Sequence, residues 1–122
     1  MGPCDGIITI ELGDFQTAPG AGAILGDFGA NVIKVEDPVH GDTFRGLYSW
    51  SEQRVQTGGR NMGFETSNRS KIGVTLNLRH KKGKEIFYKL IAKAGIFYTN
   101  YREKILRELV TNYKTLSKTC SP

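Results

Sequence analysis

The sequence has no long hydrophobic run and no cluster of metal-ligating side chains. Nothing in its 122 residues approaches the roughly 20 consecutive apolar residues that a membrane-spanning helix requires. Two cysteines, Cys4 and Cys120, stand near opposite ends, and His40 and His80 are isolated. This pattern argues against a disulfide framework and a zinc site. The first residues also lack the basic and apolar segments of a signal peptide, so we expect a cytoplasmic protein without membrane contact.

Acidic residues are scarce in the second half of the chain. Residues 69–122 contain thirteen Lys and Arg but only three acidic residues, whereas residues 1–68 contain four Lys and Arg and nine acidic residues. A basic half is typical of proteins that contact phosphate in nucleic acid, a membrane surface or a cofactor. The alternative is that these side chains solvate the outer faces of helices. Because they are spread over several helix faces and Phe87 fits a core position, the pattern argues against nucleic acid.

The first 36 residues carry the signals of a β-α-β unit. Residues 6–12 are a β-branched run typical of a buried strand. Residues 20–28 place apolar side chains at helical spacing, and residues 31–36 predict a second strand. A strand, a helix and a strand within so short a stretch imply parallel strands joined by a right-handed crossover.

The rest of the chain repeats this alternation after a long excursion over residues 37–68, for which we predict one short helix at 49–55. Residues 74–78 alternate as a strand does, and residues 96–100 predict another strand. Residues 82–94 form an amphipathic helix, with two further helices at 103–110 and 112–118. The side chains of the 82–94 helix that we predict to face the core are Ile86, Phe87, Leu90, Ile91 and Ala94. We therefore predict one α/β domain over residues 1–122: a Rossmann-like open, mainly parallel sheet of about four strands flanked by helices.

Polar and aromatic side chains follow the predicted strands where each one ends. Carboxyl ends of parallel strands meet at one edge of a sheet, where ligands usually bind. Arg79 could meet a phosphate there, Asn100 could hydrogen-bond a ligand, and the Tyr101 ring could stack on a purine. Gln16 could bind a carbonyl, amide or phosphate, or it could simply cap the helix that follows. The residues on this predicted rim are Phe15, Gln16 and Thr17, then Leu76 and Arg79, then Asn100 and Tyr101.

Two other patterns in the sequence could also mark a site. The glycines of residues 20–26 suggest a dinucleotide fingerprint, but seven residues separate Leu12 from Gly20 and the third glycine comes one position late. A close helix–strand crossing explains these small residues equally well. Asp42 and Arg45 predict a local ion pair that organises a turn. No Ser-His-Asp, Cys-His or paired-carboxylate grouping is apparent, so we predict no catalytic residue in the chain.

The order of these segments resembles the class III CoA-transferases of CaiB/BaiF type, the family of formyl-CoA transferase, carnitine CoA-transferase and α-methylacyl-CoA racemase. The twelve-residue block at 25–36, LGDFGANVIKVE, is the most specific part of the resemblance. The other residues that carry it are Asp5-Gly6-Ile7, Ala18-Pro19, Gly41-Asp42 with Arg45, Asn68-Arg69-Ser70-Lys71, Leu76-Asn77-Leu78, Gly83 and Asn100-Tyr101.

Members of that family move CoA between carboxylic acids or epimerise acyl-CoA thioesters, with a Rossmann-like large domain and two interlocked chains. The resemblance implies CoA or an acyl-CoA as a non-covalently bound ligand. It implies that Phe15, Gln16 and Thr17 lie on the loop that lines the site. It also implies that Leu76 and Arg79 lie near the adenosine end, with Arg79 favouring the 3′-phosphate, and that Asn100 and Tyr101 contact the cofactor.

The chain also departs from the family pattern. Ile72 replaces a usual basic residue, and Glu103-Lys104 replaces a usual Pro-Gly pair. The aspartate that forms the family's covalent intermediates has no counterpart in these residues. We therefore expect the amino-terminal, CoA-binding-type portion of a class III CoA-transferase, without activity by itself. We also expect a homo-oligomer or a complementary chain to cover an exposed sheet edge, and the alternative function is that of a stand-alone interaction domain.

Overall fold

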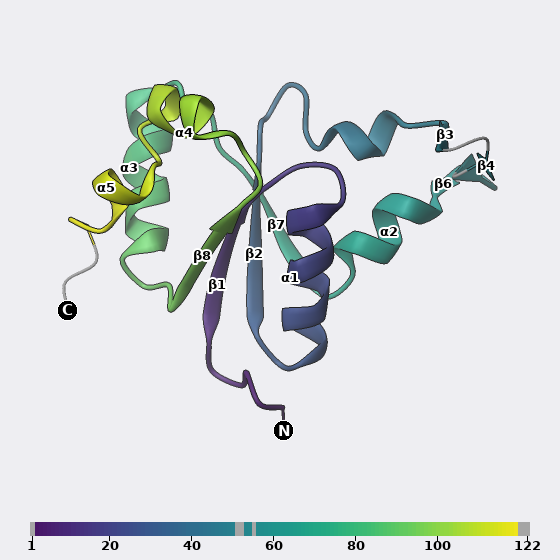
Figure 1. The fold of residues 1–122 in the computed structure, drawn as a ribbon, viewed down its shortest axis with the longest axis horizontal. Helices are drawn as coiled ribbons and strands as arrows, with labels where there is room; N and C mark the ends of the chain where they lie inside the picture. The colour runs from purple at the N-terminus through teal and green to yellow at the C-terminus, as the bar shows by residue number, and fades with distance from the viewer. Residues whose placement is uncertain (1, 51–52, 55, 120–122) are drawn as a thin grey trace.

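Four parallel strands form one open sheet in the computed structural model, which describes residues 2–50, 53–54 and 56–119. Their order across the sheet is β7-β2-β1-β8 (Figure 1). The strands are β1 (Ile8–Leu12), β2 (Asn31–Glu36), β7 (Lys71–Thr75) and β8 (Ile96–Thr99). The predicted Rossmann-like α/β sheet is therefore confirmed, with all three strand pairs parallel.

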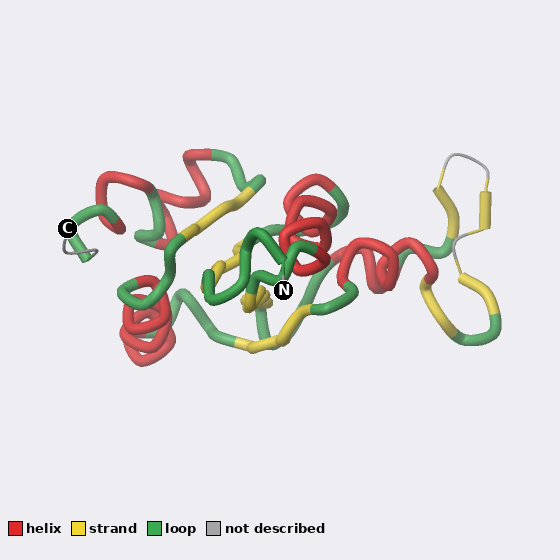
Figure 2. The backbone as a smooth tube through the Cα atoms, turned by 90° about the horizontal axis from the view of Figure 1, so that it is seen from below, coloured by secondary structure: helices red, strands yellow, loops and turns green. Residues whose placement is uncertain are grey.

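Helices cover the sheet on both faces. Helix α1 (Thr17–Asp27) packs on one face, and α3 (Lys81–Ile91) lies on the opposite face (Figure 2). The short helices α4 (Glu103–Leu109) and α5 (Tyr113–Leu116) gather on the same side of the molecule as α3 (Figure 1). Among the described residues, no helix has the length and apolar character needed to cross a bilayer.

Most predicted elements of the β-α-β type are confirmed. Strand β2 has the predicted bounds, and helix α1 begins three residues earlier than expected, at Thr17. Pro19 therefore lies in the first helical turn, where its missing N–H costs nothing. In α3, Phe87 and Ile91 are buried as predicted, but Ile86 is 47% exposed because it lies about 100° around the helix from Phe87.

The third strand of the sequence pattern is displaced. The alternation of residues 74–78 predicts a strand there, whereas β7 occupies Lys71–Thr75. Leu76 and Leu78 are nonetheless buried in the apolar core. Pairing with β2 determines where the strand lies, and the loop that follows buries its leucines at a spacing of two, which imitates a strand pattern.

The helix predicted at residues 49–55 is wrong for the described part of that segment. Ser49–Trp50 and Gln53–Arg54 form a small antiparallel pair, β3 and β4, while residues 51, 52 and 55 lie outside the described residues. A second pair, β5 (Gln56–Thr57) and β6 (Arg60–Asn61), follows it. The helix of this excursion is α2 (Met62–Asn68), where the side chain of Asn61 accepts a hydrogen bond from Phe64 N. Helix α2 and these short strands project away from the sheet (Figures 1 and 2).

The two faces of the sheet bury different side chains. Strand residues alternate in direction, so each strand contributes one set to α1 and another to α3. On the α3 side, Ile10, Leu12 and Val35 join one apolar core with Phe87 and Leu106. The α1 side buries Glu11 and Lys34 instead.

Candidate functional site

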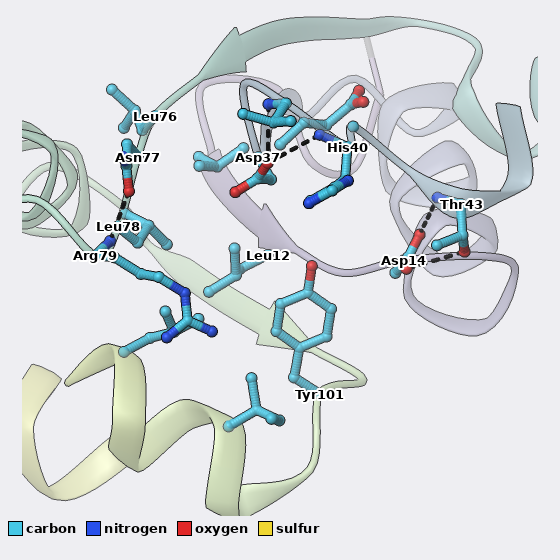
Figure 3. A pocket seen from close by; sticks show the side chains of 16 residues that line it. Leu12, Asp14, Asp37, His40, Thr43, Leu76, Asn77, Leu78, Arg79 and Tyr101 are labelled. Atoms are coloured by element: carbon cyan, nitrogen blue, oxygen red, sulfur yellow. Dashed lines mark hydrogen bonds between the residues drawn. The ribbon is translucent and has the colours of Figure 1, made fainter.

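A cavity of about 580 Å³ opens at the carboxyl ends of the parallel strands. The segments that follow β1, β2, β7 and β8 supply its walls together with α4 (Figure 3). Its apolar residues are Leu12, Val35, Val39, Leu76, Leu78, Ile105 and Leu109. Its polar and aromatic side chains are Asp14, Glu36, Asp37, His40, Thr43, Asn77, Arg79 and Tyr101. An apolar surface with a few polar groups converging on it is the usual composition of a small-molecule site.

Three of the residues predicted from the sequence, Leu76, Arg79 and Tyr101, line this cavity. The backbone N–H of Arg79 donates to Asn77 Oδ1 at 3.0 Å, and its guanidinium extends into the cavity (Figure 3). Burial raises the pKa of Tyr101 to about 12, and the nearby Asp14 and Asp42 carboxylates add to the shift. The Tyr101 phenol therefore stays protonated at neutral pH and can donate a hydrogen bond.

Asn100 braces two of the loops that form the rim and does not line the cavity. Its Oδ1 accepts a hydrogen bond from Asp14 N at 3.0 Å, and its Nδ2 donates to Asp14 O at 2.7 Å. Both polar groups of the amide are thereby engaged by one residue of the loop after β1. The two contacts tie the end of β8 to the end of β1, so the carboxyl-terminal edge of the sheet is fixed at this point.

The remaining predicted residues, Phe15, Gln16 and Thr17, also lie outside the cavity lining. Phe15 has a φ of +69°, a conformation that L-residues seldom adopt, and its ring stacks on Phe44 with centroids 4.8 Å apart. Gln16 is the N-cap residue of α1, as the alternative interpretation of it as a helix cap expects, but its side chain makes no capping hydrogen bond. Gln16 and Thr17 are both exposed.

The predicted ion pair between Asp42 and Arg45 is also wrong. Arg45 binds Glu36 in a bidentate contact, with Nε 2.9 Å from Oε2 and Nη2 2.8 Å from Oε1. Asp42 instead pairs with Lys34, and its Oδ2 lies 2.7 Å from the Lys34 Nζ. Burial alone would raise the pKa of Glu36, but the contact with Arg45 outweighs it and lowers that pKa. Arg45 pairs with Glu36 and not with Asp42 because the 3₁₀ turn at Thr43–Gly46 directs the Arg45 side chain back toward the end of β2.

Two acidic residues of the cavity, Asp14 and Asp37, are not among the site residues predicted from the sequence. Asp14 Oδ1 accepts from Thr43 N at 2.7 Å, and Asp14 Oδ2 accepts from Thr43 Oγ1 at 3.0 Å (Figure 3). Burial and the contact with Asp42 raise the pKa of Asp14 above its ordinary value. Asp37 Oδ1 accepts from the backbone N–H groups of Val39 and His40, which lower its pKa.

This turn after β2 also presents His40 to the cavity (Figure 3). The Asp37-Pro38 pair directly after a strand is a turn signal that could have identified these residues. Within the described ranges, no group of three or more His, Cys, Asp or Glu side chains could hold a metal ion.

Comparison with known proteins identifies the family. Residues 4–120 match the sequence model of CoA-transferase family III. The chain is 39% identical over 113 residues to cinnamoyl-CoA:phenyllactate CoA-transferase of Clostridium sporogenes, covering 93% of this chain and 27% of that protein. It is 38% identical over 109 residues to (R)-2-hydroxy-4-methylpentanoate CoA-transferase of Clostridioides difficile, covering 89% of this chain and 27% of that one. The chain therefore belongs to CoA-transferase family III.

Solved structures show the same fold. A CAIB/BAIF family protein from Brucella suis superposes with a TM-score of 0.82 at 30% identity, over 98% of this chain and 31% of that chain. A hypothetical protein from Mycobacterium tuberculosis superposes with a TM-score of 0.85 at 27% identity, again over 98% and 31%. The present chain thus spans about a quarter of the length of its curated relatives, with 27% of the first two covered.

Proposed function

We propose that this domain binds CoA or an acyl-CoA thioester, without a covalent bond, in the cavity at the carboxyl ends of its strands. The observation that carries the proposal is the composition of that cavity. An apolar surface that includes Leu12 and Leu78 faces a guanidinium from Arg79 and a phenol from Tyr101. CoA combines an aromatic base, phosphates and an uncharged chain, and the relatives are CoA-transferases.

Each residue of the predicted rim has a part in this proposal. Arg79 pairs with the 3′-phosphate, Leu76 contacts the adenosine, and the Tyr101 ring stacks on the base. Asn100 holds the loop after β1 through Asp14. Phe15, Gln16 and Thr17 on the same loop contact the ligand where it extends beyond the cavity.

Titration calorimetry with CoA and with dephospho-CoA tests the proposal. CoA should bind the unmodified chain more tightly than dephospho-CoA, and Arg79→Gln should remove that difference. Arg60→Gln is the matched control, because it removes the same charge from an arginine outside the cavity. The absence of any heat with millimolar CoA, or an equal loss in both variants, would contradict the proposal.

We also propose that transfer of CoA between carboxylic acids belongs to a longer assembly of which this domain is the amino-terminal part. The support is that the chain matches only 27% of the length of its first relatives. Covalent catalysis needs a nucleophile, and the resemblance gives these residues no counterpart of the family's aspartate. The purified 122-residue chain should therefore turn over no acyl-CoA, and measurable CoA transfer from an acyl-CoA to a free acid would refute this.

An interaction function is the second candidate, and two exposed isoleucines favour it. Strands β7 and β8 each pair with one neighbour in the described sheet, so both are edge strands. Ile72 on β7 is 60% exposed and Ile96 on β8 is 36% exposed. Unpaired edges with apolar side chains readily accept another strand. We propose that a second copy or a complementary chain covers one of them; sedimentation showing a monomer at high concentration, with no partner retained after gentle purification, would count against this.

A further inference from the structure

A network of buried charges lies between the sheet and helix α1. The carboxylate of Glu11 on β1 is its centre and is fully buried. Glu11 Oε1 lies 2.8 Å from the Nζ of Lys34 on β2, and Glu11 Oε2 lies 2.7 Å from the Nζ of Lys71 on β7. The hydroxyl of Tyr98 on β8 donates to Glu11 Oε2 at 2.7 Å. All four strands therefore contribute one side chain to a single cluster.

The two lysines of this network lead to different parts of the molecule. Lys71 donates to the carbonyl of Pro19 at 2.7 Å and to Asn68 Oδ1 at 3.1 Å, so it connects β7 with α1 and α2. Lys34 donates to the carbonyl of Gly13 at 3.2 Å and forms an ion pair with Asp42 Oδ2 at 2.7 Å. Gly13 and Asp42 stand next to Asp14 and Thr43 of the cavity lining. Lys34 alone of the two lysines thus reaches the cavity rim.

Asp42 also binds Phe15, whose backbone conformation is strained. Its Oδ1 accepts hydrogen bonds from Phe15 N at 3.0 Å and from Phe44 N at 2.9 Å. Burial opposes the charge on Asp42, but contacts with Asp14 and Lys34 outweigh burial and lower its pKa, so it is ionised at neutral pH. The left-handed φ of Phe15 persists only if its surroundings hold it, and such strain clusters at ligand sites.

We propose that Lys34 and Asp42 are positioning residues for the ligand site: their buried ion pair holds the loops at residues 13–15 and 41–44 together and so keeps Asp14 and Thr43 on the cavity wall. Removing Lys34 leaves the Asp42 carboxylate buried without its cationic partner. That loss disturbs the hydrogen bond from Phe15 N to Asp42 Oδ1. The disturbance reaches the Asp14 carboxylate because its Oδ1 accepts from the same N–H at 2.9 Å, while Asn100 continues to hold the Asp14 backbone. The inference rests on the proposed function for its ligand, but the positions of the loops can be tested without one.

The experiment compares Lys34→Met with Lys71→Met in the 122-residue chain. Both substitutions remove a buried lysine bound to Glu11, so both destabilise the fold, but only the first disconnects the rim. With CoA as the probe, Lys34→Met should raise Kd about tenfold, the effect of one lost hydrogen bond to a charged group. Lys71→Met should leave Kd within about twofold of the unmodified chain. Equal Kd values for the two variants would overturn the proposal.

Backbone amide NMR signals supply a readout independent of CoA. Lys34→Met should shift the amide signals of Phe15 and Phe44, whereas Lys71→Met should leave them in place. If Lys34→Met does not fold, Asp42→Asn removes the same ion pair and should give the same shifts. If the unmodified chain binds no CoA, the proposed function fails. The amide signals of Phe15 and Phe44 then decide alone whether the inference about Lys34 and Asp42 is correct. Unshifted Phe15 and Phe44 signals in Lys34→Met, or in Asp42→Asn where the first does not fold, would refute it.

Discussion

The two faces of the sheet are stabilised by different interactions. Toward α3, the strands present Ile10, Leu12 and Val35, which pack with Phe87 and Ile91 in a single apolar core. Toward α1, the sheet presents Glu11, whose carboxylate oxygens lie 2.7–2.8 Å from polar atoms of Lys34, Lys71 and Tyr98. Apolar contacts tolerate changes of shape that keep volume, whereas a buried ion pair tolerates little change in geometry.

This difference has a consequence for the ligand site. The apolar face continues into the cavity through Leu12 and Val35, which makes part of the cavity wall an extension of the core. The charged cluster around Glu11 connects to the loops that border the cavity through Lys34 and Asp42. In the proposed ligand site, one face therefore supplies part of the cavity wall, and the other holds the loops that border it.

The largest expected effect is the loss of the charge at the centre of the polar face. Glu11→Gln leaves two buried lysines short of a counter-charge, so we expect the free energy of unfolding to fall by about 5 kcal/mol, the upper end of the range for a broken buried pair. Urea denaturation followed by circular dichroism measures it. Tyr98→Phe is the matched control, since it removes one hydrogen bond to the same carboxylate and should cost about 1.5–3 kcal/mol. Equal losses would show that the charge of Glu11 is unimportant.

On the apolar face, the loss of a large core side chain should cost somewhat less. Phe87→Ala removes a fully buried ring and should lower the free energy of unfolding by about 3–5 kcal/mol, through lost burial and a residual cavity. Ile86→Ala on the same helix should cost about 1 kcal/mol or less, because that side chain is half exposed. If urea denaturation gave similar values for the two, α3 would face the sheet differently from the structure.

A smaller effect is expected from one added methyl group on α1. A Cβ at Gly22 would stand 2.1 Å from the Tyr98 hydroxyl and 2.2 Å from Glu11 Oε2, so Gly22→Ala should push the helix off the charged cluster and cost about 1–3 kcal/mol. Gly20→Ala, two residues earlier on the same helix, meets no atom within 4 Å and should stabilise the helix by up to about 1 kcal/mol. Thermal melts of both variants check the sign of each change. A stabilised Gly22→Ala protein would mean that α1 does not approach the cluster closely.

The smallest effect concerns pH. The folded-state pKa of Glu36 is lowered from its ordinary 4.5, so the charge of Glu36 stabilises the fold above that value, and this stability is lost as the pH falls below it. Glu36→Gln should therefore flatten the fall in unfolding free energy below pH 4.5. Asp14, whose pKa is raised, acts in the opposite direction, but it is common to both proteins. Glu65→Gln is the control and should flatten the profile less, because its partner Arg60 is exposed and solvent screens the pair.

Much of the fold could be predicted because local patterns and tertiary packing agree. The strand at residues 31–36 and the helix that buries Phe87 each carry one clear periodicity. The errors arise where distant contacts decide the structure. Strand β7 contains Lys71 and Gly73, which by themselves are a weak strand signal. The position of β7 is set instead by its pairing with β2 and by the contact of Lys71 with Glu11.

The candidate site was only partly predictable for a related reason. Leu76, Arg79 and Tyr101 follow strand ends, and parallel strands end at one edge, so sequence order alone brings them to one cavity. Asp14 is held at the same cavity by hydrogen bonds with Thr43, which lies on a different loop. A pattern read along the chain has no access to such contacts between loops.

The sequence by itself determined the family, through its resemblance to known members. It also determined the α/β alternation and the edge of the sheet at which polar residues gather, because these two follow from local periodicity and strand direction. The tertiary structure alone decided how the charges pair. Arg45 binds Glu36 and not Asp42, and Asp42 binds Lys34. Ion pairs depend on distances of a few ångströms between side chains from different elements, and those distances are set only when the sheet, α1 and the loops have packed together.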